Sequence, residues 1–164
     1  MSDYLNKNFL INLLTILSIF FLDRISKYFV ISQSEKNLSY DLFQSKFLNI
    51  NLIWNEGIAF GLLSFGNEVF YNIISILIAI IIIILFIMIF KAEKIKKYSY
   101  IIICGGALGN LFDRIIYKSV PDFIDFHYNE FHWFIFNIAD IFISLGVLCL
   151  IYDEIFLEKK RYGK

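Results

Sequence analysis

Aspartates inside or beside apolar stretches are the residues of this chain best suited to do chemistry. Asp23, Asp113 and Asp140 lie within such stretches, and Asp122 and Asp125 shortly precede the last of them. A charge within a membrane-spanning helix is costly, so such residues usually face a cavity and carry function. Two close carboxylates do not both ionise easily; one keeps a proton, and the pair can activate water as combined base and acid. Paired aspartates in a partly dry cavity therefore indicate amide hydrolysis without a metal.

Helical spacing places several polar residues on shared faces. Three pairs are three or four residues apart: Asp23 with Lys27, Asn110 with Arg114, and Asn137 with Asp140. Interfacial anchoring by long side chains would explain Lys27 or Arg114 alone. It does not explain Asp23 and Asp140, whose side chains are too short to reach the headgroups. The pairs therefore predict one shared polar site.

Other residue types support fewer chemistries. The sequence pairs no serine with a helical histidine, which disfavours a Ser–His triad. His127 and His132 have no cysteine or further histidine at ligand spacing, so a structural or interfacial role is expected and neither a metal nor a cofactor is predicted. Asp113 is expected to form an ion pair with a neighbouring cation. Spacing alone leaves both Asp122 and Asp125 open as partners of a dyad.

Composition defines the class of protein that must position these residues. Of the 164 residues, 59% are hydrophobic and 18% are charged, against roughly 25% charged in an average soluble domain. The mean hydropathy is +0.67, which excludes a disordered chain and disfavours a soluble enzyme. The zero net charge offers a nucleic acid no attraction. A small polytopic membrane protein with one domain, residues 1–164, is predicted, with Cys104 and Cys149 as buried apolar residues.

The predicted fold is an all-α membrane bundle of four transmembrane helices with a small periplasmic β element. The helices are expected at about 9–31, 69–90, 98–117 and 134–156. Gly105 and Gly109 give the third helix a face for close packing. The β element is expected at about 37–66, where residues 47–54 alternate loosely in polarity.

Lysine and arginine positions orient the helices. They gather in the short link at 91–97 and in the tail at 159–164, and the N-terminus adds Lys7, so both termini are predicted to be cytoplasmic. The links at 32–68 and 118–133 would then lie outside. In this topology the intramembrane polar residues share one depth near the outer surface.

Two rival classes remain open at this point. A small ion-coupled transporter or channel also carries charged residues within the membrane. Its pathway should be lined across the membrane, whereas the inner halves of these helices are almost purely apolar, and no inverted repeat is present. A non-catalytic assembly factor would not need aspartates around a cavity.

In five stretches the chain resembles the lipoprotein signal peptidase family, also called signal peptidase II. Members of this family are bacterial intramembrane aspartyl peptidases. In the family's order, the five stretches are LDRISK at 22–27, NEGIAFG at 55–61, GGALGNLFDRI at 105–115, VPDFIDF at 120–126 and FNIAD at 136–140. The resemblance covers nearly the whole chain. It implies a peptidase of the bacterial cytoplasmic (inner) membrane, with its active site near the periplasmic side.

The resemblance also assigns roles to residues. It implies that Asp122 and Asp140 are the catalytic dyad, and this alone favours Asp122 over Asp125. Residues implied to position substrate and dyad are Asp23, Lys27, Asn55, Gly57, Asn110, Arg114 and Asn137. The implied substrate is a diacylglyceryl-modified prolipoprotein, held beside membrane lipid and cleaved just before its lipidated cysteine by a monomer. Residues 58–60 would cover the bound substrate.

Two positions depart from the family's pattern. The family usually has a glycine shortly before its first catalytic aspartate, where this chain has Tyr117, Lys118 and Ser119. Pro121 directly precedes Asp122, where a β-branched residue is common; proline fixes its own φ and lacks an N–H. The local backbone leading to Asp122 is therefore expected to differ slightly.

Overall fold

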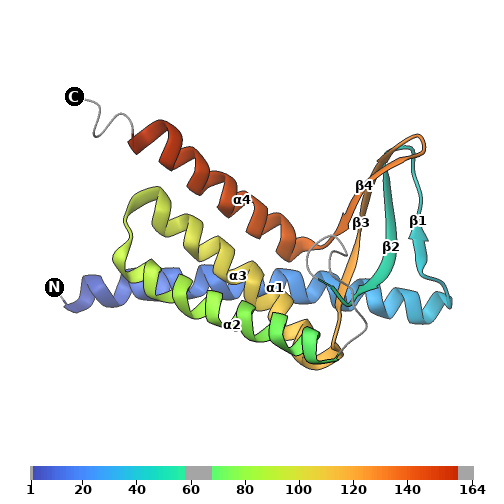
Figure 1. Ribbon diagram of the computed structural model, residues 1–164, viewed down its shortest axis with the longest axis horizontal. Coiled ribbons are helices and arrows are strands. Elements are labelled where there is room, and N and C mark those ends of the chain that lie inside the picture. The colour runs from blue at the N-terminus through green and yellow to red at the C-terminus, as the bar shows by residue number, and fades with distance from the viewer. Residues whose placement is uncertain (1, 58–67, 159–164) are drawn as a thin grey trace.

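A helical bundle with an antiparallel sheet at one end forms the architecture (Figure 1). The computed structural model describes residues 2–57 and 68–158. In chain order the elements are α1 (Ser2–Asn37), β1 (Asp41–Phe43), β2 (Leu48–Asn55), α2 (Glu68–Lys91), α3 (Lys94–Tyr117), β3 (Val120–Tyr128), β4 (Phe131–Phe136), α4 (Ile138–Tyr152) and the π-helix η2 (Asp153–Glu158). The beginning of α1 and the end of η2 lie at the end of the bundle away from the sheet.

Helix α3 is the centre of the bundle and packs against α1, α2 and α4. Its buried residues include Ile101, Cys104 and Ala107, which join Ile16 of α1 and Leu85 of α2 in one apolar core. Helix α2 buries only one side and exposes isoleucines around the rest, as expected for a helix that faces lipid. Cys149 is also exposed, on α4, so the prediction that it is buried was wrong, whereas Cys104 is buried as expected.

Small residues of α3 allow the close approach of α1, as the glycine spacing predicted. A Cβ atom on Gly105 would lie 2.9 Å from Cβ of Ile19, and one on Gly109 would lie 2.5 Å from Oδ2 of Asp23. The absence of a side chain at Gly109 therefore gives Asp23 its place between α3 and α4.

Helix α1 has 36 residues, more than the roughly 20 that a bilayer span needs. Its C-terminal part extends past the other helices to the sheet (Figure 1). There Val30 packs with Leu52 of β2 and Phe123 of β3 in a second apolar cluster. This contact fixes the sheet on the bundle and so fixes the height of β3, which carries Asp122.

The sheet has the order β1-β2-β3-β4, with every neighbouring pair antiparallel. Strands β1 and β2 fall within the predicted β element at 37–66, but the other half of the sheet comes from residues 120–136, which the sequence analysis treated as an external link and the start of a helix. Strands β3 and β4 are joined at Asn129, which has a φ of 51°, a conformation that asparagine tolerates better than most residues.

The fourth helix therefore begins at Ile138 and not at about 134. Residues 134–136 belong to β4 because an aromatic-rich run suits a strand as well as a helix, and Asn137 caps the helix that follows. Helix α3 begins at Lys94, earlier than the predicted 98. Within residues 2–57 and 68–158, three helices are long and apolar enough to cross a membrane: Asn8–Asn37, Tyr71–Lys91 and Lys94–Tyr117. They overlap the first three predicted spans.

Candidate active site

Asp122 of β3 and Asp140 of α4 line a common cavity of about 280 Å³. Asn55, Asn110 and Arg114 line it on the polar side. The remaining wall is mostly apolar and comes from α2, α3, α4 and the start of β3: Ile78, Ile81, Ile103, Ala107, Val120, Ile143 and Ser144. Residues far apart in sequence thus place two carboxyl groups at the polar end of an apolar chamber.

Asp140 is held by the N-terminal cap of α4. Asn137 is the N-cap residue, and its Oδ1 accepts a hydrogen bond from the backbone N–H of Asp140 at 3.1 Å. In return, Oδ2 of Asp140 accepts from the backbone N–H of Asn137 at 3.2 Å. This reciprocal pair is a capping box, which satisfies backbone groups that a helix end leaves open. The second aspartate of the site is therefore also a structural part of its helix.

Asp122 lies on β3 just beyond the end of that strand's pairing with β4. The last residue pair between β3 and β4 joins Ile124 to Phe136, whereas β2 continues to pair with β3 as far as Val120. Pro121 therefore lies where β3 has a neighbour on one side only, a place where a strand tolerates proline. The proline that interrupts the family's pattern is accommodated without breaking the sheet.

Lys118 ends α3 in the left-handed conformation. The family's pattern favours a glycine near this position. The φ of Lys118 is 55° and its ψ is 22°, and its backbone N–H donates to the carbonyl of Arg114 at 3.2 Å. Glycine adopts this conformation without steric cost at a helix C-terminus. The chain therefore keeps the turn that leads from α3 into β3, at some cost in backbone strain.

Two asparagines hold the Asp122 carboxyl group. Nδ2 of Asn137 donates to Oδ1 of Asp122 at 2.6 Å, and Nδ2 of Asn55 donates to Oδ2 at 2.9 Å. Both amides have a fixed direction because their oxygens are occupied. Oδ1 of Asn137 accepts from Asp140 as described, and Oδ1 of Asn55 accepts from the backbone N–H of Gly57 at 2.9 Å. Their NH₂ groups must therefore face Asp122.

Asn110 orients Asp140 in the same manner. Its Oδ1 accepts from Nζ of Lys27 at 2.9 Å, and its Nδ2 donates to Oδ1 of Asp140 at 2.8 Å. An ammonium group can only donate, so Lys27 turns the amide oxygen toward itself and the NH₂ group toward Asp140. Lys27 thereby acts on the cavity through Asn110.

Behind Asn110 lies a buried cluster of two acids and two bases. Lys27 contacts Asp113 at 2.6 Å and Asp23 at 3.0 Å. Arg24 binds both carboxylate oxygens of Asp113 and contacts Asp23 at 2.6 Å. Oδ1 of Asp23 also accepts from the backbone N–H of Ala139 at 3.0 Å, which ties α1 to the start of α4. The four charges balance, as buried charges must.

Arg114 supports the site from the other side. Its Nη2 donates to the carbonyl of Gly57 at 2.8 Å, and Gly57 is the residue whose N–H fixes Asn55. Arg114 also lines the cavity. It therefore holds the end of β2 in place and presents a positive charge to whatever enters.

Burial, and next the nearby charge of Asp140, raise the pKa of the Asp122 carboxyl group to about 6. Hydrogen bonds from Asn55 and Asn137, and the charge of Lys27, oppose this shift only in part. Two carboxyl groups close enough to interact can retain one proton over a range of pH in which isolated aspartates would have none.

The residues that the family resemblance assigned to the site either line the cavity or belong to the hydrogen-bond and ion-pair network behind it. Asp113 forms the predicted ion pairs, and Asp125 contacts Asn49 and His132 and does not line the cavity. Arg24 was not predicted as a site residue, because residues adjacent in sequence, such as Asp23 and Arg24, do not share a helix face. Only its long side chain lets Arg24 reach Asp23. Residues 58–60, which were expected to cover the substrate, lie outside the described residues.

Two neighbouring aspartates held by amides in a partly apolar cavity of a membrane-helix protein define the class: this is the arrangement of an aspartic hydrolase. A comparison of the sequence with known families narrows this class to one family. The chain belongs to the signal peptidase (SPase) II family, whose model matches residues 15–156. It is therefore a membrane peptidase, and the ion-coupled transporter has no support.

Relatives and solved structures agree with this family. The lipoprotein signal peptidase of Pelagibacter ubique (strain HTCC1062) is 50% identical over 155 residues, which cover 94% of this chain and 93% of the relative. That of Anaplasma marginale (strain Florida) is 33% identical over 94% of this chain and 89% of its own length. A solved structure described as a bacterial membrane enzyme has a TM-score of 0.71 at 34% identity, covering 93% of this chain and 90% of its own.

Proposed function

We propose that this protein is an aspartic endopeptidase that removes signal peptides from diacylglyceryl-modified prolipoproteins, cleaving just before the lipidated cysteine. The relatives' name supports the substrate class. The single observation that carries the chemistry is the shared cavity of Asp122 and Asp140, in which asparagine side chains hold both carboxyl groups.

The reaction uses the dyad as one acid and one base. The ionised aspartate takes a proton from water, whose oxygen attacks the scissile carbonyl carbon. The protonated aspartate hydrogen-bonds to the carbonyl oxygen and gives it the proton as the tetrahedral intermediate forms. When the C–N bond breaks, the dyad gives its proton to the leaving nitrogen. A hydroxyl of the intermediate gives a proton back to the dyad as the new carbonyl forms, so the dyad is singly protonated again.

The supporting residues fix this geometry. Asn55, Asn110 and Asn137 point N–H donors at the carboxyl groups and so keep both aspartates aimed at the cavity. Arg114 lines the same cavity, and its guanidinium donates to a substrate carbonyl beside the scissile bond. The apolar wall receives the apolar part of the substrate, which is the chemistry of a signal peptide and of a lipid chain.

The membrane topology proposed for this function has four spans. The 15 residues of α4 continue into the six of η2, and together they match the roughly 20 residues of a span. At the end of the bundle away from the sheet, Lys96 pairs with Glu154 at 3.1 Å and lies 3.9 Å from Asp153. The distribution of lysine and arginine supports a topology in which both termini lie in the cytoplasm and the sheet and dyad lie near the periplasmic side of the inner membrane.

The oligomeric state proposed for the active protein is a monomer. Both aspartates and the three asparagines that donate to them belong to the same chain. A single-domain monomer, with the cavity open to lipid, is the state proposed to act on the lipoprotein.

A gel-shift cleavage assay tests the proposal. Purified protein in detergent is given a diacylglyceryl-modified prolipoprotein, with Asp122→Asn as the test variant and Asp41→Asn, an exposed residue of β1, as the matched control. We expect cleavage by wild type and Asp41→Asn, with and without a chelator, and none by Asp122→Asn. Equal cleavage by Asp122→Asn would contradict the assigned dyad, and no cleavage by folded wild type would contradict the substrate class.

A further inference from the structure

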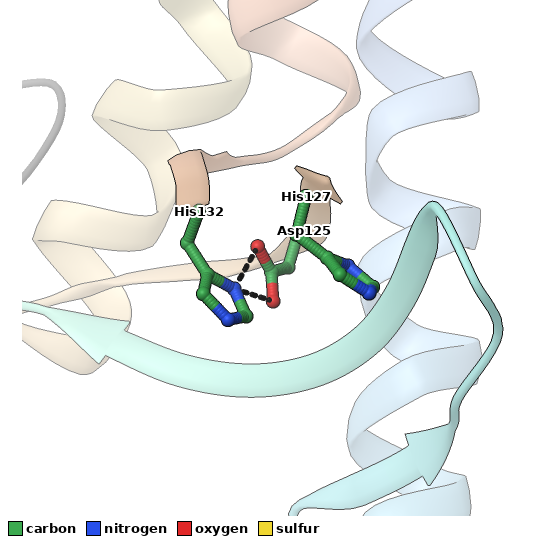
Figure 2. Close-up of side chains that lie close together, drawn as sticks. All are labelled: Asp125, His127 and His132. Atoms are coloured by element: carbon green, nitrogen blue, oxygen red, sulfur yellow. Dashed lines mark hydrogen bonds and ion pairs between the residues drawn. The ribbon is translucent and has the colours of Figure 1, made fainter. Parts of the chain in front are cut away.

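Asp125, His127 and His132 come together on the β3–β4 hairpin, outside the cavity of the dyad. Each offers one ligand atom, and these atoms all lie within 4.8 Å of one another. His127 and His132 are the only histidines of the chain. Figure 2 shows the Asp125 carboxyl group between the two imidazole rings, with dashed lines to His132.

Strand geometry explains this convergence. Asp125 and His127 are two residues apart on β3, and His132 is the residue of β4 directly opposite His127. Residues two apart on a strand share a face, and directly opposed residues are close enough for their side chains to meet. The rings of His127 and His132 lie 5.1 Å apart with an angle of 19° between them.

The hydrogen bonds of these three residues leave ligand atoms available to an ion. Nδ1 of His132 lies 2.9 Å and 3.1 Å from the two carboxylate oxygens of Asp125. Nδ1 of His127 is buried and has no hydrogen-bond partner among the described residues. A buried ring nitrogen without a partner is uncommon, and a bound cation would satisfy it.

Neighbouring strands position the carboxyl group. Asp125 is buried and lies opposite Asn49 of β2, whose Nδ2 is 3.4 Å from Oδ2 of Asp125. The backbone N–H of His127 donates to the carbonyl of Phe47 at 3.1 Å. The Asp125 and His127 backbones are thus held by the sheet, and partners that hold a ligand residue in place are typical of protein metal sites.

The geometry points to a site for one divalent transition-metal ion of the Zn²⁺ type, bound by Asp125, His127 and His132 with water in the open position. Two imidazoles and one carboxylate suit Zn²⁺ and related ions, whereas Mg²⁺ and Ca²⁺ prefer oxygen ligands alone. Ligand atoms around tetrahedral Zn²⁺ lie about 3.3 Å apart. The ion therefore draws the side chains together by rotation about their χ angles, without movement of the strands.

This site is accessible from water and separate from the dyad. The His132 side chain is 52% exposed, so an ion reaches it from the solvent side of the sheet. Asp122 is three residues before Asp125 on the same strand. The ion joins β3 to β4 and so stabilises the hairpin that carries Asp122, without taking part in hydrolysis. Histidine and cysteine spacing alone did not predict this site, because one of its three ligands is a carboxylate.

Titration with Co²⁺ tests the site, because tetrahedral Co²⁺ bound by protein ligands absorbs visible light. Full-length protein in detergent, purified with a tag that lacks histidine, is titrated with Co²⁺ and then, by calorimetry, with Zn²⁺ and Mg²⁺. We expect one equivalent of Co²⁺ with visible bands, competition by Zn²⁺, no heat from Mg²⁺, and a higher melting temperature of the wild type with Zn²⁺.

Variants separate this site from other ligands. His127→Gln and His132→Gln should each weaken Zn²⁺ binding at least about tenfold while leaving the melting temperature without metal nearly unchanged. Glu130→Gln, a carboxyl group in the hairpin turn, is the matched control and should keep wild-type affinity, as should Cys149→Ser. An ordinary Asp–His pair without an ion predicts no bands in the wild type, and that result would overturn the site. Equal binding by wild type and the double histidine variant would overturn it as well.

Discussion

The polar end of the bundle contains two pairs of aspartates that contact different kinds of side chain. Asp23 and Asp113 contact the cations Arg24 and Lys27 directly. In the described part of the chain, the carboxyl groups of Asp122 and Asp140 contact only amide N–H groups. Asn110 joins the two regions, because it accepts from Lys27 and donates to Asp140.

The difference shows how one protein uses the same residue type for structure and for chemistry. Ion pairs of Asp23 and Asp113 with Arg24 and Lys27 fix α1 against α3 and α4. Neutral amides hold Asp122 and Asp140, and in the proposed mechanism these two carboxyl groups share one proton. Variants that exchange these environments test the distinction.

Asparagine substitutions in the two regions should have opposite consequences. Asp140→Asn removes one of the two proton carriers, and the cleavage rate should fall at least about a thousandfold, with a folded protein by circular dichroism. Asp113→Asn should retain turnover per folded molecule and lose stability instead. An active Asp140→Asn enzyme would contradict the account of the dyad.

The cost of Asp113→Asn follows from the charge that it leaves behind. Arg24 and Lys27 would share a single carboxylate, and breaking a buried pair typically costs about 3–5 kcal/mol. Arg24→Gln combined with Asp113→Asn restores charge balance, so the double variant should lose clearly less stability than the sum of the single losses. Thermal unfolding in detergent of the four proteins measures this coupling. Additive losses would show that the cluster is not an electrostatic unit.

Asn110→Ala should show how much of the rate depends on the orientation of Asp140 by Asn110, separately from proton transfer by the aspartates. It removes the donor to Asp140 while leaving both aspartates in place, and a small misplacement of a catalytic group can lower a rate by up to about a hundredfold. The loss should fall mainly on kcat, because Asn110 holds Asp140. Asn49→Ala, in β2 outside the cavity, is the control for kcat. A change confined to KM would assign Asn110 to substrate binding instead.

Lys118→Gly should give the smallest effect, and it should stabilise the protein. The left-handed conformation of Lys118 costs a residue with a side chain about 1 kcal/mol, and glycine avoids this cost. For a chain of this length the melting temperature should rise by about 2–4 °C. Ser119→Gly is the control, because Ser119 does not have a positive φ. A lower melting temperature for Lys118→Gly would show that its side-chain contacts outweigh the strain.

The sequence predicted the parts of this molecule that depend on local periodicity. The apolar helices and the glycine face of α3 follow from patterns within single segments, and the structure contains them. The spacing of Asn137 and Asp140 predicted that the two residues lie together, but as neighbours on one helix face, whereas the structure shows Asn137 capping the helix that contains Asp140.

What could not be predicted depends on contacts between distant segments. Strands β3 and β4 are ambiguous locally, and only pairing with β2 decides their structure. The role of Asn137 as a bridge from Asp140 to Asp122 requires that β3 meet the start of α4. The structure accommodates Pro121 where β3 pairs with β2 alone and Lys118 at the C-terminal end of α3.

The pH dependence of kcat/KM tests the shared proton most directly. The proposed mechanism needs one proton on the dyad. Because the pKa of Asp122 is raised to about 6, the singly protonated dyad should be lost as pH rises through that value. With a lipidated peptide substrate, kcat/KM should fall by up to about tenfold per pH unit above pH 6, while the protein stays folded. A kcat/KM that is constant or rises between pH 6 and pH 8 would contradict a dyad that works by sharing one proton.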